Sequence, residues 1–313
     1  MRLLVTVIST ALLISGAGCS IGENLAFKST SKILTRAQPS LQMEADYEMA
    51  RQAIPGALKT VEGFWVAGPP DDARERLERI LTEGYCQYGT GFVEDDWEVA
   101  KFAKDIPAIE YHNNRSTNIF TRCLNFSLKL LGKRWQKEIF ETPEVVAKLI
   151  KDTGKGDRFE LMFAGAALGG LVNHNLTRVE MISYLGTVQA IMERVVEIDT
   201  KGGPPKNKAH AALPHLALGM IHSARGKAMG GDPEAAKAAF ERALAITEGK
   251  FLLARTLMAY RVGLQTNDQK FFHEHLVKVL ETPPSIWPEQ RLANEIAHRK
   301  ARRYLSHEKD IFQ

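Results

Sequence analysis

The side chains that could carry chemistry in this sequence form no known catalytic arrangement. His273 and His275 flank Glu274, but residues two apart on a helix point about 200° away from each other and make a poor metal chelate. The zinc-protease, serine-hydrolase, phosphate-loop and dinucleotide-binding motifs are all absent from the sequence. We therefore predict no catalytic residue, no metal site and no bound cofactor, and we expect the histidines to be exposed or hydrogen-bonded within the protein.

A short acidic cluster, Glu94 to Asp96, is the other candidate for chemistry. Asp95 and Asp96 could act as a carboxylate pair near Tyr85 and Tyr88. A solvated loop explains the same residues more simply, and it is the interpretation we favour.

Cys19 follows a segment that has the outline of a secretory signal. Arg2 precedes an apolar run over residues 3–14, and small residues occupy positions 15–18. This order resembles the bacterial lipoprotein signal, in which the cysteine thiol is acylated and becomes the mature N-terminus. Two acyl chains would hold the protein at a membrane, since each buried methylene contributes about 0.8 kcal/mol. Ser20 resembles the outer-membrane sorting class, so we expect a lipid anchor at the periplasmic face of the outer membrane.

The composition divides the chain into three parts. Residues 1–18 are the expected lipoprotein signal peptide, and residues 19–42 are polar and are expected to form a lipidated N-terminus and flexible tether. Residues 43–313 are expected to form a single all-helical repeat domain. The net charge of +4 is small, and the sequence has no basic block of the kind that follows a phosphate backbone, so nucleic-acid binding is not expected.

Cys86 and Cys123 are the remaining thiols. An oxidising periplasm permits a disulfide between them. Both residues lie on apolar helical faces, which favours buried free thiols, and the two alternatives remain open.

The most apolar stretch of the mature chain runs from Arg158 to Val172, where small residues leave one helix face almost flat. Close helix packing is the simpler explanation for such a face. The alternative is a ligand site, because the helix ends at polar residues that can converge on an apolar cavity. Under this hypothesis the candidate ligand-binding residues, two of them on a facing helix, are Gly165, Gly169, Gly170, Asn173, His174, Asn175, Arg255 and Tyr260.

The elements that must position these residues are helices, and the clearest lies between Gly230 and Phe251. Asp232 is expected to cap it and Gly249 to end it. Its apolar stripe is Ala236, Phe240, Ala243 and Leu244. Similar stripes occur 48 residues earlier, at Val188, Met192, Val195 and Val196, and 36 residues later, at Phe272, Leu276, Val279 and Leu280.

The recurrence of a helix–loop–helix unit favours a repeat array over an ordinary helical bundle. No segment shows the alternation of a β-strand. We therefore predict an all-α fold, a tetratricopeptide-like helical hairpin array (α-solenoid) with insertions. Ile54-Pro55-Gly56 predicts a break or kink, and the basic segment from Pro288 to Leu305 predicts a C-terminal capping helix.

Several stretches of the sequence, taken in order, resemble one family. They are residues 45–56, 91–95, 163–175, 192–199, 230–254 and 291–294 with the basic tail. The sequence resembles the TatT component family, lipoproteins associated with tripartite ATP-independent periplasmic (TRAP) transporters. Family members have many aromatic residues near the position of residues 166–171, where this chain has small ones.

The resemblance implies a tetratricopeptide-like lipoprotein that is a homotrimer and binds a periplasmic solute-binding protein of a TRAP transporter. It also implies a role in passing organic ligands, apolar ones among them, to the transporter. The alternative is a general outer-membrane-associated scaffold for protein complex assembly, because concave repeat surfaces suit that task. An unrecognised periplasmic hydrolase is a third hypothesis, and no motif supports it.

Overall fold

The computed structural model describes residues 22–224 and 231–312 of the chain, and within them every regular element is a helix. The first half contains a helix over residues 22–37, α2 (Pro39–Gln42), α3 (Tyr47–Val66), α4 (Asp71–Tyr88), the π-helix η1 (Gly89–Val93), α5 (Glu94–Phe102), α6 (Ile106–Leu131), α7 (Lys133–Glu138), α8 (Pro143–Asp152), η2 (Lys155–Asp157) and α9 (Arg158–Asn173). The second half contains α10 (Val179–Ser183), α11 (Leu185–Gly202), α12 (Lys208–His222), α13 (Pro233–Ile246), α14 (Leu252–Thr266), α15 (Gln269–Glu281), η4 (Pro284–Ile286), η5 (Pro288–Gln290), α16 (Arg291–Ser306) and α17 (Glu308–Ile311). The all-α prediction is confirmed.

Capping side chains fix where several of these helices begin. Asp46, Asp105, Asn207, Asp232 and Asp268 each accept hydrogen bonds from backbone N–H groups of the following first turn. These bonds satisfy donors that have no partner inside the helix.

Two sequence signals have different outcomes in the structure. Gly249 has a positive φ of 72° just after α13, as expected of a residue that ends a helix. Pro55, in contrast, lies inside α3, which continues without a break from Tyr47 to Val66. The packing of Ile54 and Leu58, both buried against the core, stabilises the helix across the proline.

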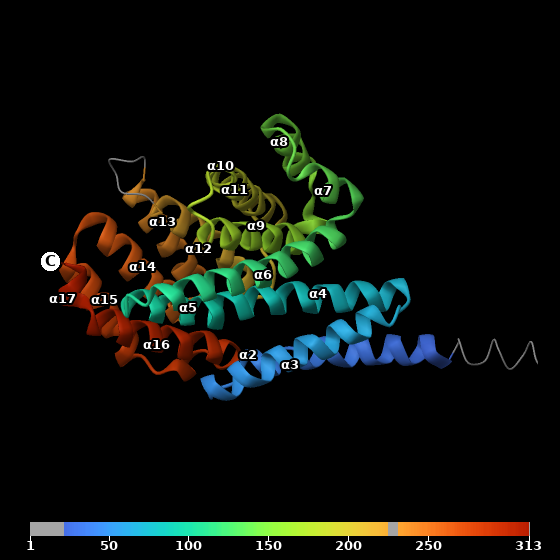
Figure 1. Cartoon of the computed structure of the whole chain (residues 1–313), viewed down its shortest axis with the longest axis horizontal. Coiled ribbons are helices and arrows are strands. Elements are labelled where there is room, and N and C mark those ends of the chain that lie inside the picture. The colour runs from blue at the N-terminus through green and yellow to red at the C-terminus, as the bar shows by residue number, and fades with distance from the viewer. Residues whose placement is uncertain (1–21, 225–230, 313) are drawn as a thin grey trace, which may run out of the picture.

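Helices that follow one another pack side by side along most of the chain (Figure 1). Helix α3 packs on α4, α4 on α6, and α6 on α9. The series of contacts continues from α9 through α11, α12, α13, α14 and α15 to α16. The stripes expected from the sequence form the core of this arrangement, with Met192, Phe240 and Phe272 all buried. Apolar periodicity therefore identified the packing faces of α11, α13 and α15 correctly.

The C-terminal helix α16 packs more widely than a terminal cap would. It contacts α14 and α15, and also α2 and α3 near the other end of the chain. In Figure 1, one end of α16, in red, lies next to α2 and the start of α3, in blue. Lys300 and His298 of α16 are buried rather than exposed, so this basic helix turns charged and polar side chains inward.

Cys86 of α4 and Cys123 of α6 form a disulfide, with their Cα atoms 5.4 Å apart. The interpretation as free thiols, which we favoured from the sequence, is therefore wrong. Both residues lie on the apolar faces where we expected them, because α4 and α6 pack along much of their length. The disulfide links these two neighbouring helices.

The described part of the expected tether is helical and packs against α4. Ser31 is buried and accepts a hydrogen bond from Arg76 Nε at 3.0 Å, and Lys28 pairs with Asp72 at 3.4 Å. Cys19 and the expected signal peptide, residues 1–18, lie outside the described residues. Among the residues that the structure describes, no helix has both the length and the apolar character needed to cross a membrane.

Candidate functional site

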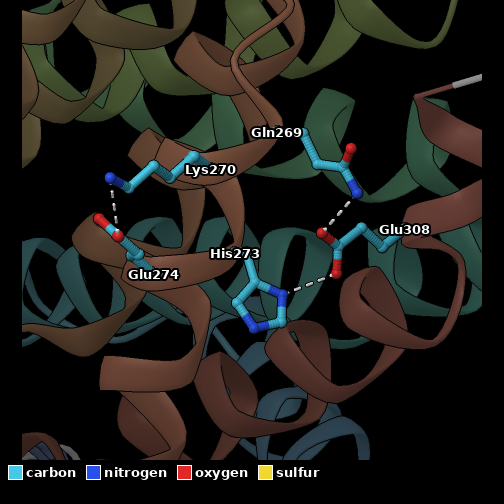
Figure 2. Close-up of a pocket in the computed structure, with 5 residues that line it drawn as sticks. All are labelled: Gln269, Lys270, His273, Glu274 and Glu308. Carbon is cyan, nitrogen blue, oxygen red and sulfur yellow. Dashed lines mark hydrogen bonds and ion pairs between the residues drawn. The ribbon is translucent and has the colours of Figure 1, made fainter.

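A shallow surface pocket lies between α15 and α17 (Figure 2). It is lined by Gln269, Lys270, His273, Glu274 and Glu308. Lys270 Nζ lies 3.8 Å from Glu274, and Glu308 lies 2.8 Å from His273 Nδ1 and accepts from Gln269 Nε2 at 3.0 Å. These side chains bond to one another, so the pocket presents no set of groups that converge on a ligand.

The two histidines of the His273-Glu274-His275 segment bind different partners. His273 contacts Glu308, whereas Nδ1 of His275 lies 3.3 Å from Arg255 Nη1. No group of three or more histidine, cysteine, aspartate or glutamate side chains within residues 22–224 and 231–312 is arranged to hold a metal ion.

The flat face of α9 is filled by neighbouring side chains. A Cβ atom placed on Gly165 would lie 2.6 Å from Ile191 Cγ2, and one on Gly170 would lie 2.7 Å from the Phe120 ring. A Cβ atom on Gly169 would lie 3.4 Å from Val188, which is ordinary contact. Close packing against α6 and α11 accounts for the glycines, and the ligand-binding role proposed for them stays a prediction.

The polar residues at the end of α9 converge, but on protein groups. His174 has a fully buried side chain whose two ring nitrogens each lie 2.9 Å from an oxygen, one of Asn113 and one of Glu94. Asn173 donates to the same Glu94 at 3.3 Å. Asn175 donates to Thr117 Oγ1 at 3.0 Å. The three residues therefore join α9 to α5 and α6.

Arg255 and Tyr260 lie on α14, whose main packing partners are α13, α15 and α16 rather than α9. The Tyr260 ring stacks on the Tyr304 ring of α16 at 4.1 Å. Tyr260 and the end of α9 are nevertheless linked through α5, because Tyr304 donates to Glu98 at 3.0 Å and the Trp97 ring lies 4.9 Å from the His174 ring. The helix that faces both segments is α5.

The acidic cluster at the start of α5 is a buried junction and not a solvated loop. Asp96 pairs with Arg51 of α3 at 2.9 Å and with Arg115 of α6 at 3.5 Å. Asp95 is fully buried and accepts from Tyr47 of α3 at 3.1 Å. Together with Glu94, these consecutive carboxylates bind side chains from different helices.

The acidic residues of α5 also bind basic residues of α16, which lie more than 200 positions later in the sequence. Arg299 Nε donates to Asp95 at 2.6 Å, and Arg303 Nη2 donates to Asp95 at 2.5 Å and to Glu98 at 2.6 Å. Lys300 donates to Glu98 at 2.7 Å. The spacing of these basic residues on one face of an amphipathic helix was visible in the sequence, but nothing local identified α5 as their partner.

The electrostatics of this cluster favour charged carboxylates. Burial by itself would raise the pKa values of Asp95 and Glu98, but the charges of Lys300 and Arg303 outweigh burial and hold both below their usual range. Burial, together with the adjacent Glu98 carboxylate, raises the pKa of Tyr304 well above its usual value. At neutral pH, Asp95 and Glu98 are therefore ionised and Tyr304 is neutral. The cluster holds α5, α3 and α16 together and does not supply a titrating acid or base.

Residues 43–312 match the family described as TRAP transporter T-component. A search of curated proteins found no match. The family match covers the structure from the residue after α2 to α17 and includes every candidate ligand-binding residue discussed above.

Proposed function

Because this chain belongs to the TRAP transporter T-component family, we propose that it is the periplasm-facing lipoprotein of such a transport system. In this role its helical body binds a periplasmic solute-binding protein and helps to pass a small organic ligand towards the transporter. The observation that carries the proposal is the family match over residues 43–312, which covers nearly all of the described helices. The family is one of transporter components rather than enzymes.

The proposed anchor at Cys19 sets how the body would lie at the membrane. The first described helical residue is 22, and three residues of extended chain span at most about 10 Å. The helix over residues 22–37 then packs on α4. An acylated Cys19 would therefore hold the helical body close to the lipid surface, within reach of a partner at the same membrane.

The anchor is tested by Cys19→Ser. Wild-type protein should incorporate a labelled fatty acid and remain with the membrane fraction. The variant should lose the label and appear as uncleaved precursor or soluble periplasmic protein. Equal labelling of both proteins would rule out acylation at Cys19.

The proposed partner is tested by affinity capture of the tagged chain from crosslinked, solubilised membranes. We expect a TRAP solute-binding protein to be enriched relative to capture with an equally tagged, unrelated lipoprotein of the same membrane. Enrichment of outer-membrane assembly proteins without a solute-binding protein would contradict the transport role and support the general scaffold. Light scattering of the purified chain tests the proposed homotrimer directly.

A further inference from the structure

The helix over residues 22–37 has two different faces. Its inward face packs on α4 through the buried Ser31 and on the core through Leu34. Its outward face carries Leu25 and Ile33, each 64% exposed. These two residues are eight positions apart, so they lie on the same side of the helix, about two turns from each other. Two exposed apolar side chains alone need no explanation, but the residues around them point to a common partner.

Positive charge accompanies the exposed apolar residues. Three exposed cations are spaced four positions apart along the helix: Lys28, Lys32 and Arg36. This spacing places them in a row beside Leu25 and Ile33. The single acidic residue between positions 22 and 37 is Glu23, two positions before Leu25 and therefore about 200° away from it around the helix. The outward face is thus apolar and basic, without a carboxylate of its own.

Exposed apolar residues also occur at the end of α3. Val66 is 70% exposed and Phe64 is 37% exposed. The ion pair of Lys28 with Asp72, at 3.4 Å, joins the beginning of the N-terminal helix to the first turn of α4, which follows α3 in the chain. Figure 1 shows the beginning of this helix, in dark blue, at the same end of the molecule as the turn from α3 to α4. Apolar and basic side chains therefore gather at the end of the molecule where the described chain begins.

We propose that the outward face of the N-terminal helix, residues 22–37, lies on an anionic phospholipid surface. Leu25 and Ile33 enter the membrane interface, and the row of cations binds lipid phosphate groups, as in helices that lie in the plane of a membrane. The long side chains of lysine and arginine suit this position, because their apolar stems can follow the interface while their charges stay in water.

Two observations favour a lipid surface over a second copy of this chain. The cations would repel the same face of another copy, whereas they complement anionic lipid. Cys19 is only three positions before residue 22, and the inference rests on the proposed acylation of Cys19, because the acyl chains bring this face to the membrane. An acyl anchor alone leaves the helical body free to rotate. A helix that also lies on the lipid determines which side of the body faces the periplasm.

The test uses the full acylated chain, extracted from membranes and reconstituted into vesicles of phosphatidylethanolamine and phosphatidylglycerol. Ser29→Cys carries an environment-sensitive fluorophore, since Ser29 is exposed and lies one turn from both Leu25 and Ile33. A thiol reagent should label only this position, because Cys86 and Cys123 form a disulfide and the thiol of Cys19 is acylated. Lipids brominated near the headgroup should quench the fluorophore.

The matched control for position is Val179→Cys with the same fluorophore. Val179 is 77% exposed on α10, which packs on α9 and α11, and its label should not be quenched. Circular dichroism and thermal melts establish that the labelled proteins are folded. If Ser29→Cys does not fold, Lys32→Cys places the fluorophore on the same face.

Charge is tested by the double change Lys32→Gln and Arg36→Gln. The equilibrium of the Ser29→Cys label between lipid and water should shift at least about tenfold towards water, because two attractions to anionic lipid are lost. The control for charge is Lys148→Gln with Lys151→Gln, two exposed cations of α8, which should leave the equilibrium unchanged. Vesicles of phosphatidylcholine alone should reduce the contact as the double change does.

The possible failures are distinguishable. Protein that does not float with the vesicles would refute the anchor, and with it the inference that rests on it. Protein that floats without quenching of the label on the N-terminal helix would refute the inference and leave the anchor standing. Equal quenching at Val179, or equal effects of the two double changes, would also refute it. A change in emission that grows with protein concentration and needs no vesicles would assign this face to a second copy of the chain.

Discussion

At the scale of single residues, the protein stabilises two buried carboxylates in different ways. Asp95 is surrounded by the positive side chains of α16. Glu83 accepts hydrogen bonds from the amides of Gln38, Gln42 and Gln87, and its Oε1 atom lies 2.9 Å from His210 Nε2. Removing a carboxylate from water is costly in both cases. Asp95 is compensated mainly by charge, and Glu83 mainly by hydrogen bonds.

Asp95→Asn should destabilise the fold by about 3–5 kcal/mol, because it leaves arginine charges buried without their partner. Asp310→Asn, at an exposed position on α17, should change the free energy of unfolding by less than about 0.5 kcal/mol. Urea denaturation of both variants measures the difference. Equal, small effects would mean that Asp95 is not the centre of the junction.

The same carboxylate predicts a dependence of stability on pH. The pKa of Asp95 is lowered in the folded protein, so its contribution is fully present above the unfolded-state pKa of about 3.9 and is lost as the pH falls through the lower folded-state value. Below about pH 4, the stability of the wild type should therefore fall more steeply than that of Asp95→Asn. Parallel curves for the two proteins would contradict the lowered pKa.

The sequence could not reveal this junction, although it contains every residue involved. Asp95 and Arg303 are separated by 208 positions, and three consecutive acidic residues ordinarily indicate a solvated segment. The Cys86–Cys123 disulfide was equally undetermined, because it depends on how α4 and α6 pack. Local pattern identified what each residue can do, and the tertiary contacts decided which partner it met.

At the scale of elements, the small residues of α9 test whether its face is packed. Gly165→Ala should destabilise the protein by about 1–3 kcal/mol, since the added methyl would overlap Ile191. Gly169→Ala, whose methyl would make ordinary contact with Val188, should be neutral or stabilise by up to about 1 kcal/mol through helix propensity. Thermal melts of the pair measure this contrast. Similar tolerance at both positions would leave room on this face for a ligand.

The N-terminal helical segment shows where apolar periodicity stops being informative. Its packed face is formed by Ser31, Leu34, Gln38, Leu41 and Gln42, spaced as a helical stripe but largely polar. The apolar stripes of α13 and α15 were found in the sequence because Phe240 and Phe272 mark them. Here Leu34 and Leu41 pack on the core, but glutamines that bond to Glu83 lie between and beside them. From sequence alone, a polar stripe is interpreted as a flexible tether, because the carboxylate that accepts its hydrogen bonds is not known.

Replacing both Gln38 and Gln42 by alanine should loosen this segment. The change removes two hydrogen bonds to a carboxylate, each worth about 1.5–3 kcal/mol, so local opening should increase at least about tenfold. Hydrogen exchange should accelerate over residues 22–43 and remain unchanged in α13. Ser40→Ala is the control on the same segment, because Ser40 is exposed and bonds only to the carbonyl of Ala37.

At the scale of the whole molecule, α16 makes this array differ from an open solenoid. In an open array each unit contacts only its neighbours and the ends unfold most easily. Here α16 follows α15 in the array and also contacts α2 and α3, while its basic side chains bind α5. The first and last parts of the chain are therefore coupled through one helix.

This coupling predicts how the protein opens when α16 is weakened. Arg303→Gln removes the side chain that bonds to both Asp95 and Glu98, so hydrogen exchange should accelerate in α5 and α16 together, although they are far apart in the sequence. Protection in α12 and α13, which pack mainly against each other, should remain as in the wild type. Arg302→Gln, one position earlier and exposed, should leave both regions unchanged. Faster exchange confined to α16 would show an end helix that frays independently, whereas faster exchange in both helices requires that α5 and α16 open as one unit.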